Sequence, residues 1–216
     1  MISIIIPARD EEKYIGYCIN SIKNQDYKDY EIIVVCNACR DNTHNIAKKY
    51  TKKVYNIKKG SVSAARNYGA KKANGDILVF LDADSIVTKT LLLKVENAIK
   101  KGYVGGICET WPIEKSFRSN ILWFLDNYVI KTFYPMPGGL TFCRKDVFPG
   151  YDEHLKIAED TYMISNLKKK GKIKFLRNAY VRTSMRRHEK LGYFNVVMRQ
   201  SFGLLYTKKQ KYEIVR

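Results

Sequence analysis

The chain has 216 residues, 45% of them hydrophobic and 12% aromatic, which is enough to bury a core and suits a single domain. Its 39 Lys and Arg residues against 21 Asp and Glu give a formal charge of +18, so we expect an acidic partner: nucleic acid, an anionic membrane surface or a phosphorylated substrate. The sequence has no uncharged apolar run of membrane-spanning length and does not begin like a signal peptide, so we expect a cytoplasmic protein.

The first 101 residues alternate between strand and helix patterns. Short apolar runs predict four strands, at 3–6, 30–36, 53–57 and 77–81, and Pro7 is expected to stop the first. A predicted helix follows each strand: one through Ile15 and Ile22, then 43–50, 63–73 and 88–101. Four such alternations in a row predict an α/β fold with a parallel sheet.

The second half of the chain is less regular. Strands are predicted at 104–108, 140–143, 173–176 and 179–182, and helices in the aromatic stretch 121–133 and from 159 to 170. An amphipathic helix is predicted from 191 to 206, ahead of a basic tail. No repeat, low-complexity tract or linker interrupts the sequence, so we expect one domain over residues 1–216.

The five cysteines lack the spacing of a disulfide framework, which fits a reducing compartment. Cys36 and Cys39 form a C-x-x-C pair after a predicted strand, as thioredoxin-like proteins also show. The aromatic and proline context of that redox motif is missing, and two cysteines are too few for a structural zinc site. We therefore favour reading them as ordinary thiols.

The most informative stretch is NGDILVFLDADS, residues 74–85. Asp82 and Asp84 follow a fully apolar strand, at the edge where open α/β sheets bind their ligands. Two carboxylates this close repel each other unless a positive group lies beside them, and a divalent cation carrying a phosphorylated substrate meets that need. The alternative is a loop in which Asp84 or Ser85 caps a helix beginning near Thr88.

Polar loops follow the other predicted strands at Pro7–Glu11, Asn37–Asp41 and Lys58–Ser61. In an open α/β sheet these loops and the Asp pair share one crevice. Two further motifs lie downstream, Glu159–Asp160 and Arg186–Arg187. Each also has an ordinary reading, since acids favour a helix start and an arginine pair can be a solvated turn.

Taken together, the motifs resemble the inverting glycosyltransferases of family 2, which have a GT-A fold. The matching segments cover roughly residues 2–190 in the expected order: SIIIPARDEE, EIIVVCNACRDNT, SAARNYGAKKANGDILVFLDAD, GGLTFCRKDVF with YDE, EDTYMISNLKKKGKIKF and MRR. The resemblance implies a Rossmann-like α/β fold with a mostly parallel central sheet flanked by helices. It also implies a donor nucleotide-binding half at 1–101, an acceptor and catalytic half at 102–190, and a C-terminal helix and basic tail at 191–216.

The resemblance assigns roles to single residues. The expected donor-binding residues are Pro7, Ala8, Arg9, Glu11, Asn37, Asp82, Ala83, Arg186 and Arg187. Asp82 and Asp84 match the pair that coordinates Mg²⁺ or Mn²⁺ through the donor diphosphate. Asp160 matches the catalytic base, with Glu159 beside it. His188 is a candidate third metal ligand, although a structural or exposed histidine is the commoner outcome.

Asn37 departs from the family pattern, which usually has an Asp that contacts the nucleotide base, and Cys36 replaces a second acid beside it. An amide both donates and accepts hydrogen bonds whereas a carboxylate only accepts them. The resemblance therefore leaves the identity of the base open.

The implied activity is that of a hexosyltransferase, which moves a sugar from a nucleotide-diphospho-sugar donor to a saccharide or lipid-linked acceptor. Positive charge develops at the anomeric carbon and negative charge on the leaving phosphate, which a metal and an arginine can neutralise while a carboxylate deprotonates the acceptor. One alternative is a sugar-phosphate nucleotidyltransferase, although such enzymes usually have a Gly-rich, Lys-bearing first loop where this chain has PARDEE. The other is a nucleic-acid-binding protein, but its known motifs are missing, so we expect no nucleic-acid partner.

Basic clusters in the second half, at 168–170, 186–187 and 208–211, accompany the apolar stretches 121–133 and 191–206. Apolar faces beside basic clusters are typical of proteins that bind an anionic membrane surface. Packing of both helices on the sheet would explain the same pattern. The sequence thus raises the hypothesis of peripheral attachment to the inner face of a membrane.

Overall fold

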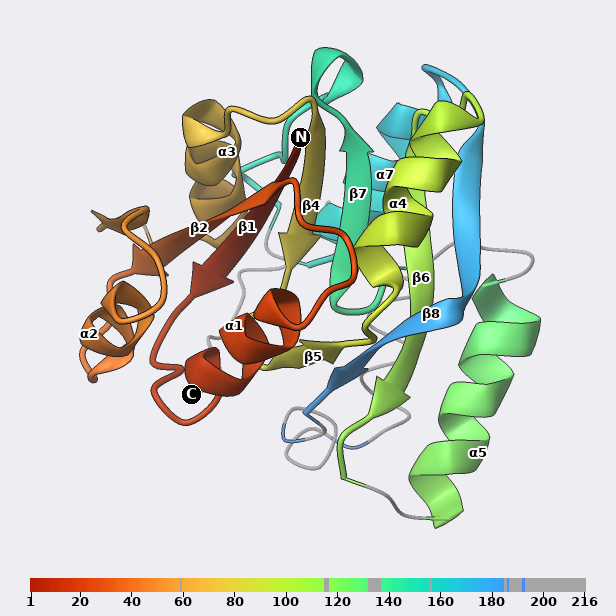
Figure 1. The fold of residues 1–216 in the computed structure, drawn as a ribbon. Helices are drawn as coiled ribbons and strands as arrows, with labels where there is room; N and C mark the ends of the chain where they lie inside the picture. The colour runs from red at the N-terminus through yellow and green to blue at the C-terminus, as the bar shows by residue number, and fades with distance from the viewer. Residues whose placement is uncertain are drawn as a thin grey trace.

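A computed structural model describes residues 1–58, 60–114, 117–131, 137–155, 157–184, 186 and 192. Within these residues, eight strands form one sheet in the order β3-β2-β1-β4-β7-β6-β8-β5 (Figure 1). Parallel pairing joins β1 to β2 and β4, β2 to β3, and β6 to β8, whereas β7 and β5 pair antiparallel with their neighbours. The predicted α/β fold with a mostly parallel sheet is confirmed.

The strands are β1 (Ile2–Ala8), β2 (Tyr30–Asn37), β3 (Val54–Ile57), β4 (Ile77–Leu81), β5 (Ser85–Val87), β6 (Gly105–Pro112), β7 (Leu140–Arg144) and β8 (Ile173–Thr183). The helices are α1 (Ile15–Lys23), α2 (Thr43–Lys48), α3 (Val62–Lys72), α4 (Leu91–Lys100), α5 (Phe117–Leu125) and α7 (Glu159–Lys168), with a π-helical segment η1 (Asp126–Ile130) and a short 3₁₀ turn η2 (Lys145–Val147). In the described part of the chain, no helix is both long and apolar enough to cross a membrane.

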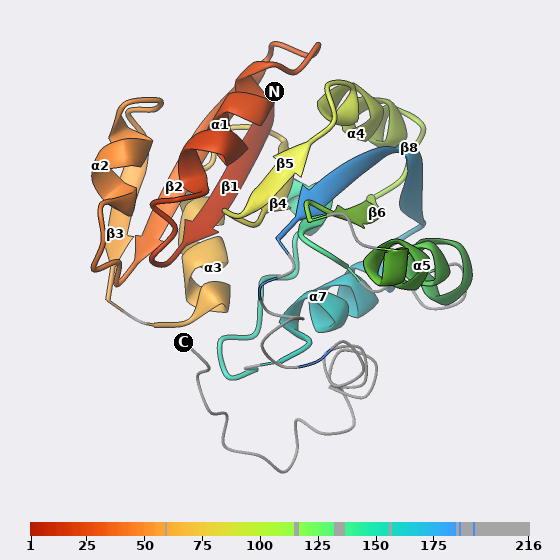
Figure 2. The same ribbon diagram turned by 90° about the horizontal axis from the view of Figure 1, so that it is seen from below.

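Helices cover both faces of the sheet, as Figures 1 and 2 show from two directions. Alternate residues of β1 separate the two layers: Ile4 and Ile6 pack in the cluster that contains α1 and α4, and Ile5 packs in the cluster that contains α3 and α7. The five residues of β4 are all buried, as its unbroken apolar run predicts. A central strand covered on both faces places the polar residues that follow it at the edge of the sheet.

Pro7 does not stop the first strand, contrary to the sequence prediction. β1 continues to Ala8, and Pro7 lies opposite Val35 of β2. The pairing of β1 with β4 ends at Ile5 opposite Phe80, so the proline follows the two-sided part of the ladder, where its missing N–H is tolerated.

The residues after Asp84 form a strand where the capping alternative predicted a helix start. Ser85–Val87 is β5, which pairs antiparallel with β8, and α4 begins only at Leu91 with Thr90 as its N-cap residue. The alternative in which Asp84 or Ser85 caps this helix is therefore wrong. Because β5 pairs with the end of β8, Asp84 is fixed next to the chain segment that carries Arg186.

The two strands predicted at 173–176 and 179–182 are one strand, β8, with an irregularity between them. Asn178 has a φ of 60°, and the register against β6 shifts between Cys108 and Glu109. The predicted helix at 121–133 is confirmed as far as Lys131. Apart from Gly192, the predicted helix at 191–206 lies outside the described residues, and so do the basic tail, Arg187 and His188.

Candidate active site

The carboxyl ends of β1, β2 and β4 meet at one edge of the sheet, which Figure 2 views from below. The loops that follow β1 and β2 are tied together by side chains that accept hydrogen bonds from backbone N–H groups. The N–H of Glu11 donates to Oγ1 of Thr43 over 2.8 Å, and the N–H of Glu12 donates to Oδ2 of Asp41 over 2.9 Å. These bonds give the candidate donor loops a fixed shape.

Asn37, at the end of β2, holds the loop between β3 and α3. Its Nδ2 donates to the carbonyl of Ser61 over 2.8 Å, and its Oδ1 accepts from the N–H of Gly60 over 2.9 Å. Arg9 reaches the same loop, since its Nη1 donates to the carbonyl of Gly60 over 3.4 Å. Because Asn37 is buried and both ends of its amide are engaged, it acts here as a clamp on the loop.

Arg66, on α3, joins the first Asp of the D-x-D motif to the predicted catalytic pair. Its guanidinium lies 2.9 Å from Oδ1 of Asp82, 3.0 Å from Oε1 of Glu159 and 3.1 Å from Oδ1 of Asp160. The arginine is buried, and its Cζ lies 5.0 Å from the ring centre of Tyr151. One buried cation thus brings together carboxylates that are up to 78 positions apart in the sequence, from Asp82 to Asp160.

Arg186 forms a second cluster with Glu11 and Asp84. Its Nη2 pairs with Oε1 of Glu11 and lies 3.2 Å from Oδ2 of Asp84, while Cζ lies 4.9 Å from the ring centre of Tyr14. Oδ1 of Asp84 accepts a long hydrogen bond of 3.4 Å from Thr183. The two carboxylates of the D-x-D motif therefore face different arginines.

Negative charge exceeds positive charge in these two clusters, which hold five carboxylates and two guanidinium groups. Burial, together with the Asp84 and Asp82 charges, raises the pKa of Glu11 to about 7 against the opposing effect of Arg186. Burial and then Asp82 raise the pKa of Asp84 to about 6. Burial also raises the pKa of Asp160 well above its usual range, although Arg66 acts against it. Additional positive charge would therefore stabilise the ionised carboxylates of the two clusters.

The chemistry of this edge fits a divalent cation that arrives with a phosphorylated ligand. Among the described residues, no group of three or more His, Cys, Asp and Glu side chains could hold an ion by itself. Mg²⁺, however, is commonly held by one or two carboxylates together with substrate phosphates and waters. Asp82, whose side chain is 37% exposed, and Asp84 supply two such carboxylates.

The structure brings together Glu11, Asp82, Asp84, Glu159, Asp160 and Arg186 from the sequence-predicted set. Pro7, Ala8 and Ala83 are buried in or beside the strands, so they can contribute only backbone groups or shape. Arg9 and Asn37 contact the Gly60 loop instead of the carboxylates. Arg187 lies outside the described residues.

Sequence reasoning missed Arg66, the residue with the most ion pairs in the described site. A signal was present, because Arg66 follows Ser63, Ala64 and Ala65 and precedes Gly69 and Ala70, all of which are buried. A single basic residue within a helix face of small residues indicates a buried charge that needs acidic partners.

A family model described as Glycosyl transferase family 2 matches residues 3–146. Poly(ribitol-phosphate) beta-N-acetylglucosaminyltransferase TarS of Staphylococcus aureus is 28% identical over 176 residues, which are 73% of this chain and 30% of TarS. Minor teichoic acid biosynthesis protein GgaB of Bacillus subtilis is 30% identical over 206 residues, 82% of this chain and 22% of GgaB. The chain thus spans less than a third of the length of these relatives.

The solved structures that are similar to this one include two complexes with nucleotide sugars. TarS of S. aureus in complex with UDP-GlcNAc has a TM-score of 0.63 at 22% identity, covering 83% of this chain and 57% of that chain. Mannosyltransferase PcManGT from Pyrobaculum calidifontis, in complex with GDP-Man and Mn²⁺, has a TM-score of 0.74 at 17% identity, covering 98% of this chain and 65% of that chain. The likeness confirms the GT-A fold expected from the sequence.

Proposed function

Because this chain belongs to glycosyltransferase family 2, we propose that it transfers a sugar from a nucleotide-diphospho-sugar donor to a saccharide or lipid-linked acceptor. The observation that carries the proposal is the pair of arginine–carboxylate clusters at the carboxyl edge of the sheet. One cluster pairs Arg66 with Asp82 and the other pairs Arg186 with Asp84, so each contains one carboxylate of the D-x-D motif. Family membership favours this activity over the nucleotidyltransferase and nucleic-acid-binding alternatives.

The donor diphosphate would lie at Asp82, Asp84 and Arg186. Arg186, with 44% of its side chain exposed, can pair with phosphate oxygens. Asp82 and Asp84 would hold Mg²⁺ or Mn²⁺, which would supply positive charge to the leaving diphosphate. PcManGT with bound Mn²⁺ supports this assignment by analogy.

Asp160 would act as the base that removes the proton of the acceptor hydroxyl, and the configuration of the sugar would invert. Its raised pKa suits proton acceptance near neutral pH. Arg66 would hold the Asp160 carboxylate in position, while Glu159 shares the same guanidinium. An acceptor phosphate would need no base, because it is already ionised.

The charge of the chain and the names of its relatives favour one class of acceptor. The name of TarS gives poly(ribitol-phosphate), a polyanion, as its acceptor. The charge of +18 on this chain would attract a polyanion of that kind. We therefore place anionic polyol-phosphate chains first among the saccharide and lipid-linked acceptors to be tried.

Attachment to the inner face of a membrane belongs to the same proposal. Large apolar side chains are exposed on η1, among them Tyr128 and Val129, and Cζ of the basic residue Arg177 on β8 lies 5.1 Å from the ring centre of Tyr128. Co-sedimentation with anionic and neutral liposomes across a salt series tests this part. Equal recovery with both kinds of vesicle at low salt would overturn it.

The proposed activity is tested with a panel of nucleotide sugars, with Mn²⁺ or with chelator, while release of nucleoside diphosphate is measured. We expect at least one donor to be turned over in the presence of Mn²⁺ and poly(ribitol phosphate) or a lipid phosphate. No turnover and no binding of any nucleoside diphosphate would contradict the proposed function.

A further inference from the structure

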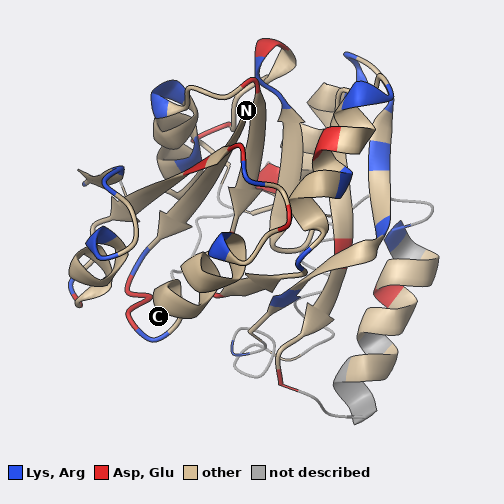
Figure 3. Cartoon of the chain, viewed as in Figure 1, with Lys and Arg blue, Asp and Glu red and all other residues tan. Residues whose placement is uncertain are grey.

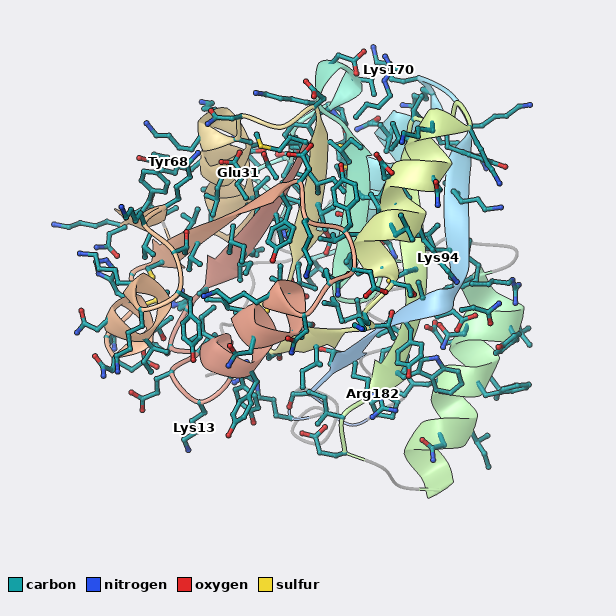
Figure 4. All side chains as sticks on the ribbon, in the orientation of Figure 1. Lys13, Glu31, Tyr68, Lys94, Lys170 and Arg182 are labelled. Atoms are coloured by element: carbon teal, nitrogen blue, oxygen red, sulfur yellow. The ribbon has the colours of Figure 1, made fainter. Side chains whose placement is uncertain are left out.

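A groove of about 700 Å³ lies between α5 and the β6–β8 pair, outside the two arginine–carboxylate clusters. Such a volume lies within the range of small-molecule sites in proteins. Its walls carry three aromatic rings and several polar groups: Glu109, Trp111, Asn120, Phe124, Tyr180 and Arg182. We call this feature the α5 groove; Figure 4 labels Arg182.

The α5 groove opens on the same face of the sheet as the candidate base. Ile107 of β6 packs in the cluster that contains α7, and strand alternation puts Glu109 and Trp111 on that side too. Asp160 lies at the start of α7, and Figure 2 shows α5 and α7 on one side of the sheet. Since only β7 separates β4 from β6, the groove begins about 10 Å from the D-x-D edge.

Glu109 places in the groove a carboxylate oxygen that lacks a hydrogen-bond donor in the described part of the chain. Its side chain is buried, with 4% of the residue exposed. Oε2 accepts a long bond of 3.4 Å from Nε1 of Trp111, whereas Oε1 has no partner among the described residues. A buried carboxylate oxygen without a partner is costly, so an occupant that brings hydroxyl groups is favoured.

The aromatic rings further restrict the kinds of ligand that the groove can bind. Trp111 and Tyr180 form the floor on β6 and β8, and Phe124, which is 53% exposed, forms part of the wall on α5. Rings beside a few fixed polar groups suit a ligand with apolar C–H faces and hydroxyl edges. A lipid chain or an apolar helix would leave Glu109 without a donor, and a phosphate would repel it.

We propose that the α5 groove binds a polyhydroxyl unit of the acceptor chain, a saccharide ring or a polyol. This inference rests on the proposed function, because it gives the groove a role in holding the acceptor on the side of Asp160. Glu109 would accept hydroxyl hydrogen bonds, and Arg182 would meet a neighbouring phosphate where the acceptor carries one.

Tryptophan fluorescence provides a binding test that does not require turnover. The chain has two tryptophans, so Trp123→Phe leaves Trp111 in the groove as the sole reporter. In this background we would titrate a neutral chitin oligosaccharide and a ribitol phosphate oligomer, which separate the two sources of a polyhydroxyl unit. We expect at least one to change the Trp111 emission, and the reverse variant Trp111→Phe to give no response.

Two substitutions then locate the binding. Glu109→Gln should weaken it by about tenfold or more, as expected for loss of a hydrogen bond to a charged group. Phe124→Ala should weaken binding severalfold. Because the Phe124 ring is exposed, its removal is not expected to unfold the protein, so a loss of binding can be attributed to the groove. Tyr17→Ala, at a ring 68% exposed on α1, is the matched control and should leave binding unchanged.

The proposal is overturned if neither oligomer alters Trp111 emission, or if folded Glu109→Gln and Phe124→Ala both bind as tightly as the parent. Binding of nucleoside diphosphate with Mn²⁺ is measured in parallel on the unsubstituted chain. Its absence would count against the proposed function, whereas its presence without oligomer binding would count against the α5 groove alone.

Discussion

Arg66 joins three carboxylates from two motifs, the D-x-D pair and Glu159–Asp160, and its burial makes this arrangement costly to break. Removing one partner of a buried ion pair leaves uncompensated charge, which typically costs several kcal/mol. The planar guanidinium reaches Asp82 with Nη2 and the Glu159–Asp160 pair with Nη1. A lysine ammonium cannot reproduce this two-sided geometry.

Arg66→Met should therefore destabilise the protein by about 3–5 kcal/mol, measured by urea unfolding at neutral pH. Arg66→Lys should keep more of the stability but reduce turnover, because Asp160 loses its fixed position. Lys71→Met, at an exposed position of the same helix, should change stability by no more than about 0.5 kcal/mol. Full stability in Arg66→Met would refute a structural role for the ion pairs.

Asp160→Asn preserves the shape of the side chain and removes its basicity. Turnover with a hydroxyl acceptor should fall by about a hundredfold or more, while nucleoside diphosphate binding persists. Steady-state kinetics and thermal shift on the same preparation separate the two effects. Unchanged turnover would assign the base elsewhere, or indicate an acceptor phosphate.

At the scale of elements, the central strands could be predicted from their apolar runs, and the D-x-D edge followed from the position of β4. Three features could not be predicted. Pro7 continues β1 because β4 has ended beside it, and β5 forms because β8 pairs with it. The left-handed backbone at Asn178 interrupts the apolar pattern of β8, so that one long strand is predicted as two. Each depends on a partner strand distant in sequence, which local patterns do not reveal.

The candidate site shows the same limit. Its carboxylates could be named from motifs, but the pairing of Arg186 with Glu11 spans 175 positions and has no local signal. The amide of Asn37 could be recognised as a departure from the family pattern, yet its engagement with Gly60 and Ser61 depends on how β2 and β3 are paired.

The loop between β3 and α3 should respond to Asn37→Asp. The new carboxylate would face the Ser61 carbonyl, where Nδ2 now donates, so stability at pH 7 should fall by about 1–3 kcal/mol. Protonation restores a donor, so part of the loss should be recovered near pH 4. Asn97→Asp, at an exposed position of α4, is the control for the added charge. Equal unfolding curves for both variants would show that the clamp is unimportant.

At the scale of the whole molecule, Lys and Arg are spread over many elements of this strongly basic chain (Figure 3). Five carboxylates nevertheless lie together in the two arginine–carboxylate clusters, and this arrangement should make stability depend on pH. The pKa of Glu11 in the folded state is about 7, above its ordinary value of 4.5, because burial disfavours the charged form. Between these two values the folded state binds more protons than the unfolded state, so stability falls as pH rises.

In the presence of chelator, the free energy of unfolding should therefore decrease from about pH 4.5 to pH 7, and Glu11→Gln should reduce this slope. Denaturant titrations at half-unit pH steps measure it. Glu12→Gln, which removes an exposed carboxylate at the next position, should leave the slope as it is. A slope that is unchanged in Glu11→Gln would contradict the burial argument.

The central claim is that Asp82 and Asp84 bind a nucleoside diphosphate together with a divalent cation. Thermal unfolding with UDP or GDP, with Mn²⁺ or with chelator, tests it on the unsubstituted chain and on Asp84→Asn. We predict that Mn²⁺ with one of the two nucleotides stabilises the unsubstituted chain by about 2–3 kcal/mol at a hundredfold excess over the Kd, and that Asp84→Asn folds but loses the metal-dependent part. A metal-dependent shift of the same size in Asp84→Asn would contradict the account.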